Sequence, residues 1–216
     1  MTPQPRNRPN PRLYLLTPGV SDPVALSGAL AEIFRAADVA AVLLHPRDAD
    51  ERGLINKAKA VAPTVQASGA ALIIAGRPDI VARAGADGAH VIGPQALQSA
   101  IATLKPNYIA GIGGLRSRHD AMVGAEAGAD YVMFGEPDAV GHHPSRDTII
   151  DRVAWWAEVF EIPCVGYAST LDDIDALVAA GADFVAIGGA LFEDPRGLKA
   201  AAADAAARLT VTETTT

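Results

Sequence analysis

Side chains that can carry out chemistry stand at the ends of short apolar runs in this chain: His45, Arg47, Arg77 and Glu136. A histidine can exchange a proton near neutral pH and a carboxylate can act as an acid or a base, so His45 and Glu136 are candidate catalytic residues. A guanidinium can bind a phosphate through two hydrogen bonds, which makes Arg77 and Arg47 candidate phosphate ligands. For His45 and Arg47 the alternative is a solvated loop.

A second candidate phosphate site lies near the end of the chain. In the stretch AIGGALFEDP, Gly188 and Gly189 let the backbone approach a ligand, and the free amide groups of the helix that follows attract a phosphate. Ser169 and Thr170 follow the preceding run, and Thr170 forms a capping-box-like pattern with Asp173. These four residues predict phosphate binding, unless the glycines only turn the chain and Thr170 only caps its helix.

Eight apolar runs have the length of buried strands: Leu13–Thr17, Ala41–His45, Ala71–Ala75, Gly88–Ile92, Tyr108–Ile112, Tyr131–Phe134, Pro163–Tyr167 and Phe184–Ile187. Stretches between them are typical of helices, among them Pro23–Ala37, Asp50–Ser68, His119–Glu126, Thr148–Phe160 and Asp172–Ala179. Alternating strands and helices require parallel pairing, so we predict an α/β fold, a single (β/α)8 TIM barrel, with a doubly wound sheet as the alternative. In a barrel, the candidate residues meet at the carboxyl ends of the strands.

Three stretches repeat one pattern: AGADGAHVIG from Ala84, AGADYVMFGE from Ala127 and AGADFVAIGG from Ala180. In each, glycine can adopt the left-handed conformation that closes a helix, aspartate tolerates the turn that follows, and the apolar run has strand length. The repeat supports a chain built from βα units.

Composition and the chain ends narrow the class of protein. The formal net charge is -7, which argues against nucleic acid as a partner, and no apolar run is long enough for a membrane span. Residues 1–12 carry four prolines and no apolar segment, so we predict a disordered N-terminal arm, a barrel over 13–208 and a flexible tail over 209–216. A lone cysteine, Cys164, fits a cytoplasmic protein and a buried strand.

Other side chains suggest structure more than chemistry. His142 and His143 stand among acidic residues, but their spacing matches no standard zinc pattern, so we predict no metal ligands there. His90 lies inside a predicted strand and is interpreted as a core histidine with a satisfied hydrogen bond. Trp155 and Trp156 are neighbours on a helix, so one of them faces away from the core, towards a subunit contact; a homodimer is a further expectation.

From Leu13 to about Pro195 the chain resembles the thiamine phosphate synthase and thiazole tautomerase superfamily. The similar stretches are LYLLT, ALIIAGRPDIVARAGADGAHV, AGADYVMFGEP and AGADFVAIGGALF. The synthase of that family is a transferase that joins a pyrimidine pyrophosphate to a thiazole phosphate with the help of magnesium, and the tautomerase isomerises the thiazole. The resemblance therefore implies a barrel, a role in thiamine biosynthesis and a phosphorylated heterocycle as the small-molecule ligand.

The chain departs from the family pattern where magnesium is expected. Ala75, Gly76 and Arg77 stand in place of the family's Asn-Asp-Arg, and Gln95 stands where a carboxylate is expected after the fourth strand. The family's usual magnesium ligands are therefore absent, and the Thr and Lys of its sixth loop have no counterpart in GEPDAVGHHPSRD. Arg77 and the last glycine pair keep the family's residue types.

Three functions stay open on these residues. The first is a divergent enzyme that acts on a phosphorylated small molecule. The second is a non-catalytic barrel that binds a phosphate ligand or has a regulatory role. The third is a barrel of another phosphate-binding family that has reached a similar scaffold.

Overall fold

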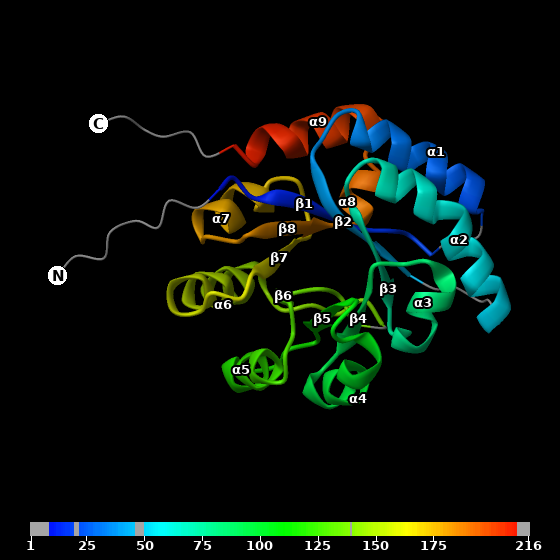
Figure 1. The fold of residues 1–216 in the computed structure, drawn as a ribbon. Coiled ribbons are helices and arrows are strands. Elements are labelled where there is room, and N and C mark those ends of the chain that lie inside the picture. Colours follow the sequence, from blue (N-terminus) through cyan, green and yellow to red (C-terminus); the bar gives the residue numbers. More distant parts are fainter. Residues whose placement is uncertain (1–8, 20–21, 46–49, 139, 211–216) are drawn as a thin grey trace.

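The computed structural model describes residues 9–19, 22–45, 50–138 and 140–210. Eight parallel strands close into a barrel in chain order, and the helices surround it (Figure 1). The strands are β1 (Arg12–Leu16), β2 (Val39–Leu44), β3 (Ala71–Ala75), β4 (Gly88–Ile92), β5 (Ile109–Gly113), β6 (Tyr131–Phe134), β7 (Cys164–Ala168) and β8 (Phe184–Ile187). The prediction of a (β/α)8 barrel is confirmed, and β3, β4, β6 and β8 have the predicted bounds.

The helical elements are α1 (Pro23–Phe34), α2 (Glu51–Ala67), η1 (Pro78–Ile80), α3 (Val81–Ala84), α4 (Pro94–Leu104), α5 (Arg118–Glu126), α6 (Arg146–Val159), α7 (Asp173–Ala179), α8 (Gly189–Phe192) and α9 (Leu198–Arg208). Helix α6 begins two residues before the predicted Thr148, because Ser145 caps it by accepting a hydrogen bond from the Thr148 amide. Within the described ranges, no helix combines the length and apolar character that a bilayer span requires.

The ends of the barrel differ from the predicted boundaries by a residue or two. Arg12, which the sequence predicts to lie in the N-terminal arm, is the first residue of β1, because it pairs with Phe184 of β8; its guanidinium also makes two hydrogen bonds to Asp38, which precedes β2. Leu209, which we assigned to the tail, is buried directly after α9. The rest of the predicted arm up to residue 8, and the tail from residue 211, lie outside the described residues.

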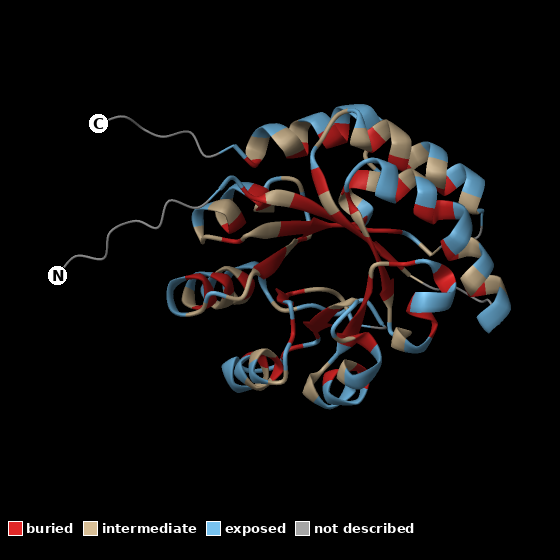
Figure 2. Cartoon of the chain, in the orientation of Figure 1, coloured by how far each residue is buried: buried red, intermediate tan, exposed pale blue. Residues whose placement is uncertain are grey.

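Two apolar layers hold the barrel together. The larger layer lies between the strands and the helices, whose inner faces are buried while their outer faces are exposed (Figure 2). The smaller layer lies in the barrel interior, and its buried members include Tyr14, Leu43, Ile73, Met133 and Val165. Since the interior is packed, chemistry is confined to the ends of the barrel.

The repeated AGAD stretches have a structural role that their sequence shows only in part. Their glycines take positive φ angles, 67° at Gly85, 99° at Gly128 and 88° at Gly181, as predicted for helix ends. Their aspartates do more than tolerate a turn, because each carboxylate accepts a hydrogen bond from a backbone amide near the start of the preceding strand. The pairs are Asp87 with Leu72, Asp130 with Ala110 and Asp183 with Cys164. The repeat therefore joins β3 to β4, β5 to β6 and β7 to β8 at the amino end of the barrel.

Candidate functional site

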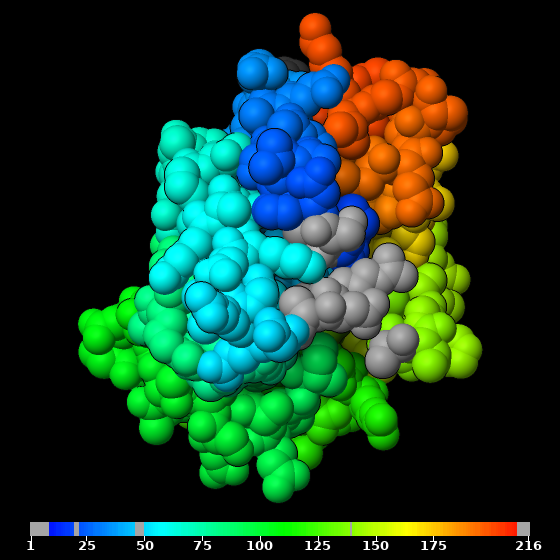
Figure 3. Space-filling view, turned by 90° about the vertical axis from the view of Figure 1, so that its right-hand side faces the viewer, coloured from blue at the N-terminus to red at the C-terminus, as the bar shows by residue number. Residues whose placement is uncertain are grey.

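The carboxyl ends of the eight strands open on one face of the molecule. Figure 3 shows this face, bordered by the blue and cyan residues of α1 and α2 and by the orange residues around α8. Ile92 is the last residue of β4 at this face, and it is 60 % exposed, which is unusual for a large aliphatic residue in a barrel strand. The face therefore offers an apolar surface beside polar groups, the combination that small-molecule sites use.

A column of polar side chains runs through the barrel interior below this face. The hydroxyls of Tyr14 and Tyr131 are 2.6 Å apart, and the Tyr131 hydroxyl lies 3.0 Å from Nδ1 of His90. All three side chains are buried, and the rings of His90 and Tyr131 stack. Burial raises the pKa of the Tyr14 hydroxyl and of the Tyr131 hydroxyl well above 10, so both stay protonated at neutral pH.

Glu136 closes the column at the mouth. Its Oε1 accepts a hydrogen bond from the Gly114 amide and lies 3.8 Å from Nε2 of His90. The side chain of Glu136 is only 8 % exposed, and Nε2 of His90 is buried without a hydrogen-bond partner among the described residues. A buried polar atom without a partner is costly in a folded protein, so its position next to a carboxylate indicates a functional arrangement.

Strand β5 makes room for the column by presenting glycines to the interior. A Cβ atom on Gly111 would lie 2.1 Å from Cζ of Tyr131. On Gly113 it would lie 1.7 Å from Oε1 of Glu136 and 2.6 Å from Nε2 of His90. Larger residues at these two positions of β5 are therefore incompatible with the observed positions of Tyr131, His90 and Glu136.

His45 lies at the same end of the barrel, directly after β2. Its amide donates to the hydroxyl oxygen of Thr17, and its Nδ1 lies 3.2 Å from the Thr17 carbonyl oxygen. Burial lowers the pKa of His45 from its usual value, and the hydrogen bond to the Thr17 carbonyl oxygen only partly offsets this effect. His45 is therefore mostly neutral at pH 7. Arg47, the predicted phosphate ligand beside it, lies outside the described residues.

Arg77 is held by carboxylates. Its guanidinium makes two hydrogen bonds to Asp79, at 2.8 and 2.6 Å, and one of 2.9 Å to Glu51. These contacts raise the pKa of Arg77 further and lower the pKa of Asp79. A phosphate would have to displace them, and β3 is three strands away from β8 around the barrel. The structure thus does not bring Arg77 together with the glycine pair.

The loops after β7 and β8 contain the other predicted phosphate ligands. The amides of Ser169 and Thr170 both donate to Oδ2 of Asp173, at 3.1 and 2.9 Å, so the first residue of α7 holds the loop before it, and no side chain among the described residues caps the helix. Helix α8 begins at Gly189, and the carbonyl oxygen of Gly188 accepts its first hydrogen bonds. These bonds come from the amides of Leu191 and Phe192, so only the amides of Gly189 and Ala190 precede the hydrogen-bonded turn, where a phosphate could bind.

Arg146 adds a cation to this region. Its Nε donates to Oδ1 of Asp173 at 2.8 Å, and its side chain is 55 % exposed. Within the described part of the chain, the Nη atoms of Arg146 make no hydrogen bond. A guanidinium with free donors beside the loop after β7 can bind an anion bidentately.

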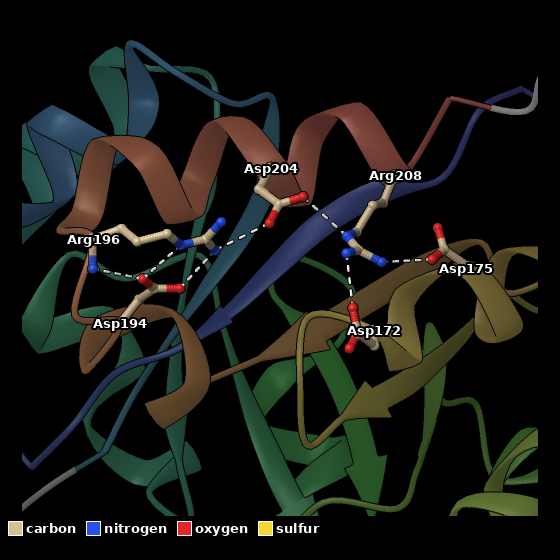
Figure 4. A network of polar contacts seen from close by, with 6 residues as sticks. All are labelled: Asp172, Asp175, Asp194, Arg196, Asp204 and Arg208. Atoms are coloured by element: carbon tan, nitrogen blue, oxygen red, sulfur yellow. Dashed lines mark hydrogen bonds and ion pairs between the residues drawn. The ribbon is translucent and has the colours of Figure 1, made fainter.

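An ion-pair network connects α9 to the start of α7, which follows the β7 loop, and to the segment after α8 (Figure 4). Arg208 binds Asp172 and Asp175, at 2.8 and 2.6 Å, and also contacts Asp204 on its own helix. Arg196 contacts Asp204 as well and makes hydrogen bonds to Asp194, which follows α8. The hydrogen bonds from Arg196 lower the pKa of Asp194 to about 2. Such exposed pairs stabilise little one by one, but together they fix the loops after β7 and α8 relative to each other.

The residues do not fit the magnesium site that the family implies. The structure has Ala75 and Gly76 at the end of β3, and the carboxylates of Glu51 and Asp79, which contact the neighbouring Arg77, are engaged in ion pairs. Among the described residues, no group of three or more His, Cys, Asp or Glu side chains could hold a metal ion. The loop that contains Asp138 and His142 shows why: this carboxylate binds backbone amides, including that of His142, and the His142 side chain is 85 % exposed.

Some residues of the site were not predicted from the sequence. We interpreted His90 as a core histidine with a satisfied hydrogen bond, and only its Nδ1 is satisfied. The apolar runs predict strands at Tyr14 and Tyr131 without a role for their hydroxyls, and no sequence pattern singles out Arg146. One signal was present: each of Tyr14, His90 and Tyr131 places a polar atom within an apolar strand.

These features define a (β/α)8 barrel with a buried histidine beside a carboxylate and two candidate phosphate loops at the carboxyl end of its strands. The model of the thiamine monophosphate synthase family matches residues 13–191. The thiamine-phosphate synthase of Rhodospirillum centenum is 39 % identical over 196 residues, covering 89 % of this chain and 95 % of the relative. That of Hyphomonas neptunium is 33 % identical over 214 residues, covering 93 % and 95 %. The chain therefore belongs to the thiamine monophosphate synthase family.

Solved structures agree with the fold. Thiamine phosphate pyrophosphorylase from Pyrococcus furiosus superimposes with a TM-score of 0.74 at 19 % identity, covering 92 % of this chain and 95 % of that one. At this identity the likeness supports the barrel architecture. Family membership in turn supports a role in thiamine biosynthesis.

Proposed function

We propose that this protein binds a phosphorylated heterocycle of thiamine biosynthesis at the carboxyl end of its barrel, without the magnesium site of its family. The observation that carries the proposal is a contrast between two parts of this face. Around β3, the arginine and the carboxylates neutralise one another. Around β7 and β8, the backbone amides of the glycine pair, Gly188 and Gly189, stand near loops that α9 holds in place.

In the proposed complex, the phosphate lies between the first turn of α8 and the loop that contains Ser169 and Thr170. Arg146 neutralises part of its charge, because its Nη atoms make no hydrogen bond within the described chain. The heterocycle extends over the exposed side chain of Ile92, towards Glu136. This arrangement needs no metal ion to hold the phosphate.

The first test is a thermal-shift titration with thiazole phosphate, thiamine phosphate and pyrophosphate, each with and without magnesium. A ligand at about 100 times its Kd adds roughly 2.7 kcal/mol of stability. We expect stabilisation by thiazole phosphate that is independent of magnesium. If none of the three stabilises the protein, the proposal is wrong and the barrel serves another ligand.

A matched pair of variants tests the phosphate position. We expect Arg146→Ala to weaken thiazole phosphate binding by about 10- to 100-fold, since a charge-assisted hydrogen bond contributes roughly 1.5–3 kcal/mol. Arg35→Ala is the control, because Arg35 follows α1 at the amino end of the barrel. Equal affinities of the two variants in calorimetry would show that Arg146 does not contact the phosphate.

Turnover distinguishes an enzyme from a binding protein. Pyrimidine pyrophosphate and thiazole phosphate are incubated with the protein, with and without magnesium, and thiamine phosphate is measured. Product that disappears in Arg146→Ala identifies a synthase that has lost the family's metal site. Binding of thiazole phosphate without any product indicates the alternative, a non-catalytic binding or regulatory barrel.

A further inference from the structure

For an uncharged His90 ring, the hydrogens of the buried column can point in one of two directions. In the first, Tyr14 donates to Tyr131, Tyr131 donates to Nδ1 of His90, and Nε2 of His90 carries a hydrogen towards Glu136. In the second, Nδ1 of His90 donates to Tyr131 and Tyr131 donates to Tyr14. Both directions fit the distances of 2.6 and 3.0 Å, since either tyrosine oxygen can be the donor.

The surroundings of the column decide between the two directions. Glu136 stands at the upper end of the column, with its Oε1 3.8 Å from Nε2 of His90. In the second direction, the lone pair of Nε2 would face this carboxylate, and the two would repel each other. In the first direction, Nε2 presents a hydrogen to the carboxylate, and the interaction is attractive.

We propose that Tyr14 and Tyr131 hold His90 as the neutral Nε2–H tautomer, and that His90 positions Glu136 to bind a hydrogen-bond donor of the ligand. The role of Glu136 in ligand binding rests on the proposed function. His90 does not touch the ligand in this arrangement. It acts through Glu136, whose Oε1 accepts a hydrogen bond from the Gly114 amide and lies 3.8 Å from Nε2 of His90.

The two oxygens of Glu136 have different surroundings. Oε1 is occupied by the Gly114 amide and lies closest to His90, whereas Oε2 makes no hydrogen bond within the described residues. Oε2 is also not among the fully buried polar atoms that lack a partner, so it retains contact with solvent. It is therefore free to accept a hydrogen bond from an amino, ring N–H or hydroxyl group. The chemical class of ligand is a heterocycle that carries such a donor.

The tautomer is tested by nitrogen NMR on the full-length protein labelled with ¹⁵N. Long-range proton–nitrogen spectra distinguish the protonated ring nitrogen from the unprotonated one, and His90→Gln assigns the signal. We expect a protonated Nε2 and a hydrogen-bonded, unprotonated Nδ1 at neutral pH. In Tyr131→Phe the Nδ1 signal should shift, whereas Tyr167→Phe, which removes a hydroxyl at the mouth, should leave it unchanged. An Nδ1–H tautomer in the unmodified protein would overturn the proposal.

The role of Glu136 is tested by comparing two ligands. Thiamine phosphate carries an exocyclic amino group, and thiazole phosphate has no N–H or O–H on its ring. We expect Glu136→Gln to weaken thiamine phosphate binding at least tenfold and thiazole phosphate binding less than threefold. Glu126→Gln, at the exposed end of α5, is the control. Equal losses for both ligands, or no loss, would refute a donor-specific role of Glu136.

The experiments separate this inference from the proposed function. If the unmodified protein binds neither thiamine phosphate nor thiazole phosphate, the proposed function and the proposed role of Glu136 in ligand binding are both wrong. The NMR result still decides the tautomer of His90. If both ligands bind but Tyr131→Phe leaves the preference for thiamine phosphate unchanged, His90 does not position Glu136. Thermal unfolding of each variant confirms that the affinities are measured on folded protein.

Discussion

Replacing Gly113 by alanine tests whether the mouth of the barrel depends on the space that this glycine leaves. Gly113 lies in β5 without a positive φ angle, so alanine fits its backbone conformation. The added methyl carbon, however, would lie 1.7 Å from Oε1 of Glu136 and 2.6 Å from Nε2 of His90. The end of the Glu136 side chain can rotate away, whereas the buried ring of His90 cannot. The expected consequence is a Glu136 carboxylate displaced from the Gly114 amide.

The magnitude follows from the hydrogen bond that is lost. A hydrogen bond to a charged group contributes about 1.5–3 kcal/mol to stability. For a domain of this size, 1 kcal/mol corresponds to a change of roughly 2–4 °C in Tm. We therefore expect the Tm of Gly113→Ala to fall by roughly 3–12 °C. The affinity for thiamine phosphate should fall with it, because the carboxylate no longer lies over His90.

Differential scanning calorimetry and chemical denaturation measure the loss of stability, and Gly28→Ala provides the matched control. Gly28 lies inside α1, where a Cβ would meet no atom within 4 Å, so alanine should stabilise the helix by roughly 0.5–1 kcal/mol. The two Gly→Ala changes thus have opposite expected signs. If Gly113→Ala matches the unmodified protein in Tm and in the nitrogen shifts of His90, the packing argument for this site is wrong.

Further changes test the charges and the repeats. The folded-state pKa of His45 lies below its unfolded value of about 6.5, so the unfolded chain binds more protons as the pH falls through that value. The protein therefore loses stability on acidification, and His45→Gln should reduce the loss of Tm between about pH 7.5 and 5. Asp130→Ala should destabilise the barrel by about 1–3 kcal/mol in urea unfolding, because the Ala110 amide loses its acceptor; an unchanged midpoint would contradict this. The pKa of Asp194 is lowered to about 2, so the ion pair between Asp194 and Arg196 stabilises the folded protein fully above about pH 4 and is lost as the pH falls below that value. The difference in Tm between the unmodified protein and Arg196→Ala should therefore shrink as the pH falls towards about 2.

Most of the fold could be predicted from local signals in the sequence. Strand β6 and strand β8 have the predicted bounds because each is a compact apolar run that follows a glycine turn. The start of α6 was misplaced, because its cap depends on the hydrogen bond between Ser145 and Thr148 rather than on apolar spacing. Such local errors move a boundary without changing the barrel.

The candidate site was less predictable because its contacts join distant parts of the chain. Tyr14 and Tyr131 are 117 residues apart in sequence, and no local pattern indicates that their hydroxyls meet. Arg77 is similar: its position after β3 suggests a phosphate ligand, yet the structure pairs it with Glu51, 26 residues earlier. The sequence predicts Glu136 at the mouth of the barrel, but it does not predict that His90 lies beside it, because only the closed barrel brings β4 and the end of β6 together.

The two ends of the barrel explain how such a site can depart from its family while the scaffold is kept. The repeated aspartates, such as Asp87 and Asp183, join neighbouring strands at the amino end and contribute nothing to the mouth. The groups of the mouth, Glu136 above His90 and the amides before α8, are at the opposite ends of the strands. Substitutions there leave the strand-joining hydrogen bonds intact. The proposed loss of the metal ligands is therefore compatible with an unchanged fold, and in the proposed complex the Glu136 carboxylate beside a buried histidine takes part in ligand recognition.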